Sequence, residues 1–180
     1  LQSDNVQFVL QDSARRIWIG TDKGLYCWKD NALQCVDKSH SFQRACSFKG
    51  KTCFITVDGE IRTADKEGRL SLAAKLPDVS YGLDLPGNLA VGSQWVIFTS
   101  EGSFVFDTES NMLRPSPPEW NIPGGEVSVD NRGNYWVHNK TGKLYYIRSG
   151  TGAVKVFQLM PREKVGYIDM ERYHVVRDSR

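Results

Sequence analysis

The sequence lacks the features by which several classes of protein are recognised. Its wholly apolar runs are only a few residues long, whereas a membrane-spanning helix needs about 20 such residues. The 23 Lys and Arg and 21 Asp and Glu residues give a net charge of +2, without the basic stripe that nucleic-acid-binding proteins carry. Apolar residues spaced three and four apart are also rare, which disfavours long helices. We therefore expect no membrane span, no nucleic-acid partner and little helix.

Groups that bind metals or perform catalysis are few and scattered as well. The 3 histidines lie in different parts of the chain, and no Ser–His–Asp set or carboxylate pair can be inferred from spacing. The 4 cysteines do not follow the C-x-x-C spacing of zinc sites. The sequence therefore predicts neither a metal nor a cofactor, and it does not favour an enzyme.

The residues that are plentiful favour β structure. The chain contains 7 Tyr, 8 Phe, 5 Trp and 16 Gly, and apolar and polar residues alternate through most of it. Its first part is predicted to form a meander of four short strands, because turn-forming Asp, Ser, Asn and Gly residues separate the apolar segments. These predicted strands are 6–10, 17–20, 25–28 and 33–36.

The four-strand unit returns further along the chain. Its second strand aligns through Trp18, Phe54, Val96 and Trp136, which lie 36, 42 and 40 residues apart. In addition, residues 12–18 match 130–136 in register. A period of about forty residues with four strands per period is typical of β-propeller blades. A β-sandwich with coincidental spacing is the alternative.

The predicted fold is therefore all-β, a partial β-propeller of about four four-stranded antiparallel blades plus the first strand of a fifth. The repeats span about 5–37, 41–76, 80–115 and 125–160, with a further repeat starting at 171–180. Residues 173–180 overlay 7–14, and the first residue is Leu rather than Met. We therefore expect a segment of a longer propeller, whose terminal blades carry exposed edges or apolar faces that a neighbour covers.

Two features of the repeat have more than one interpretation. Trp18 and Trp136 are placed either to stack on a ligand or to pack between adjacent blades, and packing is the commoner role of a large aromatic. Cys46 and Cys53 flank a predicted turn at 49–50 and would face each other across an antiparallel pair centred on that turn. Such a pair fits a disulfide in an oxidising compartment, or two buried free thiols.

The segment from Ile17 to Tyr26, Ile-Trp-Ile-Gly-Thr-Asp-Lys-Gly-Leu-Tyr, preceded by Asp12, resembles the two-component regulator propeller repeat. The match is strong in the first copy, moderate in the fourth and weak in the second, where residues 56–59 depart from Gly-Thr-x-x-Gly. That repeat is typical of periplasmic sensor regions in bacterial hybrid histidine kinases, especially those of gut Bacteroides that sense glycans. The resemblance implies a periplasmic, non-catalytic sensing segment of a membrane-anchored histidine kinase. It also implies the rest of the parent propeller as a partner and an oligosaccharide as the ligand.

One face of the predicted propeller is the place to look for binding. There the loops after each fourth strand and the turns between second and third strands come together. The longest such loop is 114–126, which prolines stiffen, with Trp120 near its predicted tip. Trp120 is placed either to stack on a sugar ring, with Asn121 and Glu119 beside it to accept the hydroxyl protons, or to fold back onto the blade. Tyr81, His138 and Asn139 are further candidates on the same face.

Two other functions fit the sequence. A propeller can be a protein-interaction scaffold, whose loops bind a partner chain or mediate formation of a homodimer. Propellers also include hydrolases and lyases, and a fold by itself does not define a function. Ligand sensing is placed first because it follows from the resemblance to the regulator repeat.

Overall fold

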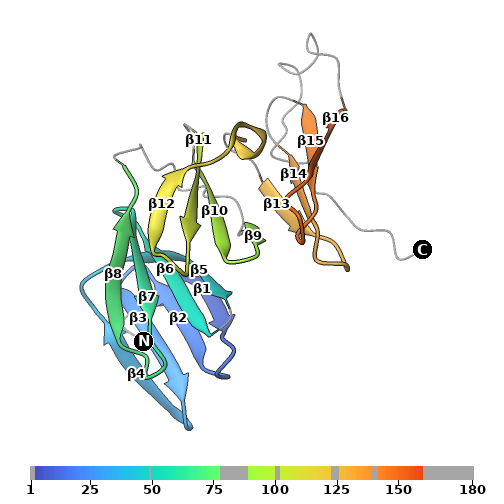
Figure 1. Cartoon of the computed structure of the whole chain (residues 1–180). Coiled ribbons are helices and arrows are strands. Elements are labelled where there is room, and N and C mark those ends of the chain that lie inside the picture. Colours follow the sequence, from blue (N-terminus) through green and yellow to red (C-terminus); the bar gives the residue numbers. More distant parts are fainter. Residues whose placement is uncertain are drawn as a thin grey trace. The chain divides into compact units, whose positions relative to one another are not determined.

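The computed structural model describes residues 3–48, 50–77, 89–99, 102–122, 126–138 and 142–159. In these residues it contains 16 strands and one short 3-10 helix, and the strands form four sheets (Figure 1). Each sheet has four strands, arranged in the order in which they follow along the chain. The prediction of four four-stranded antiparallel units in an all-β chain is confirmed. The predicted start of a fifth repeat, 171–180, lies outside the described residues.

The four sheets follow one another along the chain. The first sheet consists of β1 (Val6–Gln11), β2 (Ile17–Thr21), β3 (Gly24–Lys29) and β4 (Ala32–Asp37), and the second of β5 (Phe42–Phe48), β6 (Lys51–Thr56), β7 (Glu60–Ala64) and β8 (Leu70–Lys75). The third consists of β9 (Leu89–Val91), β10 (Gln94–Thr99), β11 (Gly102–Asp107) and β12 (Met112–Pro115), and the fourth of β13 (Glu126–Val129), β14 (Tyr135–His138), β15 (Lys143–Ile147) and β16 (Val154–Gln158). The 3-10 helix η1 (Pro118–Trp120) follows β12 in the sequence.

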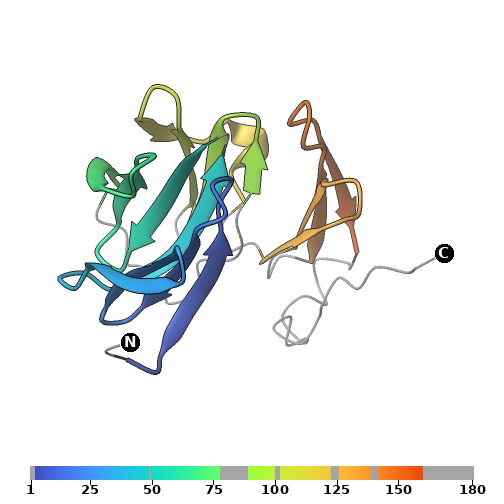
Figure 2. The same ribbon diagram turned by 90° about the horizontal axis from the view of Figure 1, so that it is seen from below.

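The described strands belong to two compact units. The first unit holds the first and second sheets together with residues 106–113, and the second holds the rest of the third sheet and the fourth sheet. Each unit has an apolar core of its own. In the first unit, β1 and β2 lie against β5 (Figure 2). No helix within the described ranges is long and apolar enough to cross a membrane.

A recurrent aspartate turn leads from the first strand of a sheet to the second. After β1, the Oδ1 atom of Asp12 accepts hydrogen bonds from the backbone amides two and four residues further on, at 2.9 and 3.0 Å. After β13, Oδ1 of Asp130 accepts the same pair of bonds, both at 2.9 Å. The third residue after each aspartate has a positive φ, 62° at Arg15 and 77° at Gly133. The sequence match of 12–18 with 130–136 therefore reflects one hydrogen-bonded turn that is built twice.

The core of the first unit lies between its two sheets. Trp18 of β2 is fully buried and packs edge-on against Phe54 of β6, with ring centroids 5.0 Å apart. Phe42 of β5 and Leu25 of β3 belong to the same cluster. The interpretation of Trp18 as a residue that packs between adjacent blades is confirmed.

The contact between Trp18 and Phe54 corrects the alignment of the second repeat. Successive side chains of a strand point to opposite faces of a sheet. Trp18 points toward the second sheet and Phe54 points back toward the first, so they are not equivalent positions. If Thr56 is matched with Thr21 instead, Cys53 takes the place of Trp18. The predicted alignment was wrong by one residue because the β6–β7 turn is one residue longer than the β2–β3 turn.

The core of the second unit joins the third and fourth sheets. Its buried residues include Val96 and Phe98 of β10, Val137 of β14 and Ile147 of β15. Trp136 is not among them, because it points to the other face of the fourth sheet. There its ring lies 4.7 Å from that of Tyr146, measured between centroids. The two tryptophans of the repeat therefore differ in burial although their local turns are alike.

Candidate functional site

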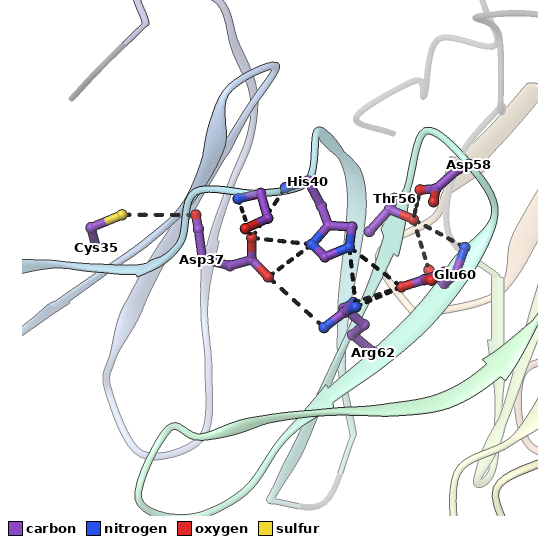
Figure 3. A network of polar contacts seen from close by, with 8 residues as sticks. Cys35, Asp37, His40, Thr56, Asp58, Glu60 and Arg62 are labelled. Atoms are coloured by element: carbon purple, nitrogen blue, oxygen red, sulfur yellow. Dashed lines mark hydrogen bonds and ion pairs between the residues drawn. The ribbon is translucent and has the colours of Figure 1, made fainter.

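A network of polar side chains joins the first two sheets at the end where β4 continues into β5 (Figure 3). Asp37 ends β4, His40 lies in the connection to β5, and Glu60 and Arg62 lie on β7. Thr56 and Asp58, at the β6–β7 turn, lie next to Glu60 (Figure 3). We call these six residues the β4–β5 network. It occupies the end of the sheets at which the sequence predicts ligand binding.

His40 links Asp37, at the end of the first sheet, to Arg62 of the second sheet. Its Nδ1 atom lies 3.0 and 3.2 Å from the two carboxylate oxygens of Asp37, and its Nε2 atom lies 3.2 Å from Nη2 of Arg62. A guanidinium can only donate hydrogen bonds. Nε2 of His40 therefore accepts from Arg62, which leaves the proton on Nδ1 to be donated to Asp37. This tautomer is assigned from the hydrogen-bond geometry, and Nε2 also lies 3.8 Å from Oε2 of Glu60.

Arg62 is held on its other side by Glu60. Its Nε and Nη2 atoms donate to Oε2 of Glu60 at 2.9 and 2.7 Å, and its Nη1 atom lies 3.8 Å from Oδ2 of Asp37. The four side chains Asp37, His40, Glu60 and Arg62 are between 11% and 23% exposed. They are thus largely shielded by protein and still within reach of solvent.

Two carboxylates of the network are held in their ionised form. Burial raises the pKa of Asp37, but hydrogen bonds from the Ser39 amide and from His40 outweigh it, so that the pKa is lowered from 3.8. The Thr56 hydroxyl donates to Asp58 at 2.6 Å, and this bond lowers the pKa of Asp58. The network therefore presents carboxylates, a guanidinium and an imidazole side by side. Such side chains donate hydrogen bonds to hydroxyls and accept hydrogen bonds from them. Within the described part of the chain, no cluster of three or more His, Cys, Asp or Glu side chains could hold a metal ion.

The sequence did not indicate this network. Glu60 and Arg62 are two residues apart on one strand, so their side chains lie on the same face of the sheet, and their opposite charges indicate an ion pair. Their partner His40 lies in a loop of the preceding connection, and no motif or spacing links it to β7. Only the packing of the second sheet on the first brings the three together.

Trp120, the residue predicted to meet a ligand, is turned inward. It closes η1, is only 8% exposed and belongs to the core of the second unit. Its Nε1 atom donates a hydrogen bond of 2.9 Å to the carbonyl oxygen of Gly152, in the β15–β16 turn. This position does not fit a ring offered to a sugar and corrects that expectation, because burial of the indole satisfies both its apolar surface and its N–H. The alternative, a Trp folded back onto the blade, matches its position.

The other predicted site residues differ in position. Asn121 is exposed, and its Oδ1 atom accepts a hydrogen bond of 3.2 Å from the Ser103 amide. His138 ends β14 and is buried. Tyr81 and Asn139 lie outside the described residues. Asn121 is therefore the one residue of this set that the described ranges place at the surface.

The register predicted for Cys46 and Cys53 is confirmed, because the two residues pair directly across β5 and β6. Both are buried and carry free thiols. Burial raises the pKa of each thiol to about 12. Of the two alternatives for this pair, the structure contains the buried thiols.

No protein-family model matches the chain, and no curated protein matches it in sequence. Among solved structures, the extracellular domain of BT4673 from B. thetaiotaomicron superposes with a TM-score of 0.63 at 12% identity, over 89% of this chain and 25% of that one. The WD40 domain of Neurospora crassa Pan2 gives a TM-score of 0.59 at 12% identity, over 86% of this chain and 50% of that one. The fold is that of β-propeller blades.

A third propeller of this kind is an enzyme. Virginiamycin B lyase from Staphylococcus aureus superposes with a TM-score of 0.61 at 12% identity, over 86% of this chain and 55% of the lyase. The chain thus spans a quarter of the BT4673 domain and about half of the lyase. At such identities the likeness concerns the fold, and propellers of one fold serve different functions.

Proposed function

We propose that this chain is a ligand-sensing propeller segment of an extracytoplasmic, two-component sensor, placed in the periplasm as part of a membrane-anchored histidine kinase. The observation that carries the proposal is the run of four blades that superposes on the extracellular domain of BT4673, a one-component or hybrid two-component system. The Asp-to-Trp segment that resembles the regulator propeller repeat supports it from the sequence. The segment itself is non-catalytic, and kinase activity belongs to other parts of the parent.

The proposed ligand is an oligosaccharide bound at the loop ends of the sheets. In the first unit these ends carry the β4–β5 network, whose Asp37, Glu60 and Arg62 side chains suit sugar hydroxyls. The residues predicted from the sequence stay proposed as separate candidate contacts: Asn121, which is exposed, His138, which is buried, and Tyr81 and Asn139. Trp120 has a supporting role, because its burial fixes the backbone that presents Asn121.

A thermal-shift screen of the chain against a panel of oligosaccharides tests this function. A glycan that binds the native state stabilises it by RT ln(1 + L/Kd), where L is the free glycan concentration, so the melting temperature rises with the logarithm of that concentration above the dissociation constant. Arg62→Ala is expected to weaken binding of that glycan by about tenfold or more. Arg69→Ala is the matched control, since Arg69 is a highly exposed arginine at the β7–β8 turn, at the other end of the same strand.

The second unit is tested with an asparagine pair. Asn121→Ala is expected to weaken binding, whereas Asn131→Ala, an exposed residue of the Asp130 turn, leaves it unchanged. A panel in which no oligosaccharide raises the melting temperature would remove the glycan as ligand. Equal affinities of the Arg62→Ala protein and the wild type would remove the β4–β5 network from the site.

A protein-interaction scaffold is the second candidate function. It is favoured by exposed apolar side chains that gather on one face of the first sheet, among them Val9, Trp28 and Leu33. Sugar-binding loops do not account for such a face, because it lies along the strands rather than at their ends.

A further inference from the structure

Asp37 and Arg62 of the β4–β5 network face each other at a distance that is too long for a hydrogen bond (Figure 3). Oδ2 of Asp37 and Nη1 of Arg62 lie 3.8 Å apart, whereas a hydrogen bond between nitrogen and oxygen is about 2.7–3.2 Å long. Oδ2 accepts one hydrogen bond, from His40, and Nη1 donates to no described residue. The side chains are 11% and 18% exposed. We call them the Asp37–Arg62 pair, which offers solvent an acceptor beside a donor.

The other nitrogens of the Arg62 guanidinium are occupied. Nε and Nη2 both donate to Oε2 of Glu60, at 2.9 and 2.7 Å, and Nη2 also lies 3.2 Å from Nε2 of His40. An arginine binds a carboxylate best through two neighbouring nitrogens that donate in parallel. Nη2 belongs to both pairs of neighbouring nitrogens in the guanidinium, and it already has two acceptors. Arg62 therefore offers a ligand the single donor Nη1.

A hydroxyl group suits the Asp37–Arg62 pair, because a hydroxyl both accepts and donates hydrogen bonds. An oxygen about 2.8 Å from Nη1 and from Oδ2 completes a triangle whose third side is the observed 3.8 Å. This oxygen accepts from Arg62 and donates its proton to Asp37. A carboxylate in the same place has no proton to donate, so its oxygen lies against a second carboxylate.

The charges around the pair also oppose an anionic ligand. Burial raises the pKa of Asp37, but hydrogen bonds from Ser39 and His40 outweigh it and lower the pKa below 3.8, so the carboxylate is ionised at neutral pH. Asp58 and Glu60 bring the network to three carboxylates against one guanidinium (Figure 3).

A cation lies on the far side of the network. Lys75 of β8 is exposed and pairs with Glu60 across the second sheet. It belongs to the strand beyond Glu60 and makes no hydrogen bond or ion pair with Asp37 or Arg62 in the described part of the chain. An anionic ligand held by Lys75 is therefore the competing outcome that the experiment has to separate.

The pair is located between two successive sheets of the chain. Arg62 pairs with Phe54 across β6 and β7, and Phe54 packs on Trp18 of the first sheet, so Arg62 lies on the face that meets the first sheet. Asp37 ends β4, the last strand of that first sheet. A sheet packed on the outward face of either one would leave the pair in place.

We propose that the Asp37–Arg62 pair binds a hydroxyl group of an uncharged oligosaccharide and discriminates against glycans that carry carboxylates. This specificity rests on the proposed glycan-sensing function and adds to it the class of glycan. Arg62 donates to the hydroxyl oxygen, and Asp37 accepts the hydroxyl proton. Glu60 and His40 position the guanidinium so that only Nη1 is offered.

Isothermal titration calorimetry at neutral pH tests the proposal with matched glycans. The probes are short gluco-, galacto- and manno-oligosaccharides, each compared with the same chain after oxidation of its primary hydroxyl groups to carboxylates. The wild type is expected to bind at least one uncharged chain, and to bind the oxidised form of that chain about tenfold or more weakly.

Asp37→Asn tests the role of the pair. The amide cannot accept the hydroxyl proton at the position of its nitrogen and carries no charge, so this variant is expected to bind the uncharged chain about tenfold more weakly and to discriminate less between the two forms. Asp22→Asn is the control. It removes the same charge from an exposed position in the β2–β3 turn, at the same end of the first sheet as Asp37, and is expected to keep both affinities.

Circular dichroism establishes that the variants are folded; if Asp37→Asn does not fold, Arg62→Lys takes its place, because it keeps the positive charge and removes Nη1. Oxidised chains that bind the wild type as tightly as uncharged ones overturn the specificity and leave glycan sensing intact. Loss of that binding in Lys75→Ala would assign it to the lysine. A panel in which neither form binds removes the sensing function and the specificity with it.

Discussion

At the level of single residues, Asp12 is a buried carboxylate with both oxygens in use. Its Oδ2 atom accepts hydrogen bonds from Nε of Arg16 at 2.7 Å and from Nε1 of Trp18 at 2.8 Å. Its Oδ1 atom accepts the two backbone bonds of the turn. Both side chains of the ion pair are nearly inaccessible, at 3% for Arg16 and 2% for Asp12. The turn, the tryptophan and the cross-sheet contact of Arg16 therefore depend on one charge.

Asp12→Asn is expected to lower the free energy of unfolding by about 3–5 kcal/mol, because it leaves the buried guanidinium of Arg16 without a counter-charge. Urea denaturation at neutral pH measures this. Asp30→Asn, at a position that is 86% exposed, is the control and is expected to change stability by about 0.5 kcal/mol or less. Equal stability of the two variants would contradict the role given to Asp12.

Asp12 also predicts how stability responds to acid. Burial raises the pKa of Asp12, but the hydrogen bonds from Trp18 and Arg16 outweigh it, and the pKa is lowered from 3.8. The folded state then binds fewer protons than the unfolded state near this pKa, so the contribution of Asp12 is present above about pH 4 and is lost as the pH falls through the folded pKa. The free energy of unfolding of Asp12→Asn is expected to fall less steeply below pH 4 than that of the wild type.

The cysteines predict a pattern of thiol reactivity. With a pKa of about 12, Cys46 and Cys53 stay protonated near neutral pH, and only a thiolate reacts quickly. In the reduced, native chain Cys35 is the exposed cysteine, so an aromatic disulfide reagent is expected to label it first, and Cys35→Ser removes the fast phase. Fast labelling of Cys46 or Cys53 would contradict their burial. Non-reducing mass spectrometry of protein from an oxidising compartment decides whether the facing pair becomes a disulfide.

At the level of elements, η1 shows how a proline-rich connection is fixed. Pro118 begins the helix, and its Trp120 reaches Gly152, 32 residues further along the chain, in the β15–β16 turn. The Ser103 hydroxyl donates to the carbonyl oxygen of Trp120 at 2.6 Å. The connection is thus held from the third sheet on one side and from the fourth on the other.

Gly152→Ala is expected to destabilise the chain more than Gly92→Ala does. Both glycines have positive φ, 69° and 62°, so each substitution carries a backbone strain of about 1 kcal/mol. A Cβ at Gly152 would lie 2.3 Å from the Trp120 ring, whereas one at Gly92 meets nothing within 4 Å. Overpacking adds about 1–3 kcal/mol at Gly152. Chemical denaturation measures both variants, and equal losses would show that Trp120 does not pack on this turn.

At the level of the whole molecule, the loop ends and the strand faces of the first sheet differ in character. The loop ends carry the charged and polar groups of the β4–β5 network, whereas Val9, Trp28 and Leu33 along the strands are exposed and apolar. The first set suits a polar ligand and the second an apolar surface of a protein partner, so the two candidate functions use different surfaces.

The sequence by itself determined the local features of this protein. Alternation of apolar and polar residues defines strands, and the Asp12 and Asp130 segments define a turn, because both depend on residues a few positions apart. The facing of Cys46 and Cys53 follows from the same short-range register. These features suffice for the prediction of four four-stranded blades.

Only the tertiary structure decided what lies between the blades. It placed Trp120 in the core, since its partner Gly152 belongs to another sheet, and it assembled His40 and Arg62 from separate elements. It also showed that Phe54 packs against Trp18 and is not its equivalent in the second repeat. When two repeats are aligned from the end of a turn, one extra residue in that turn shifts the preceding strand by one position and so exchanges the two faces of the sheet. Contacts between sheets depend on which faces meet, and short-range periodicity carries no information about that.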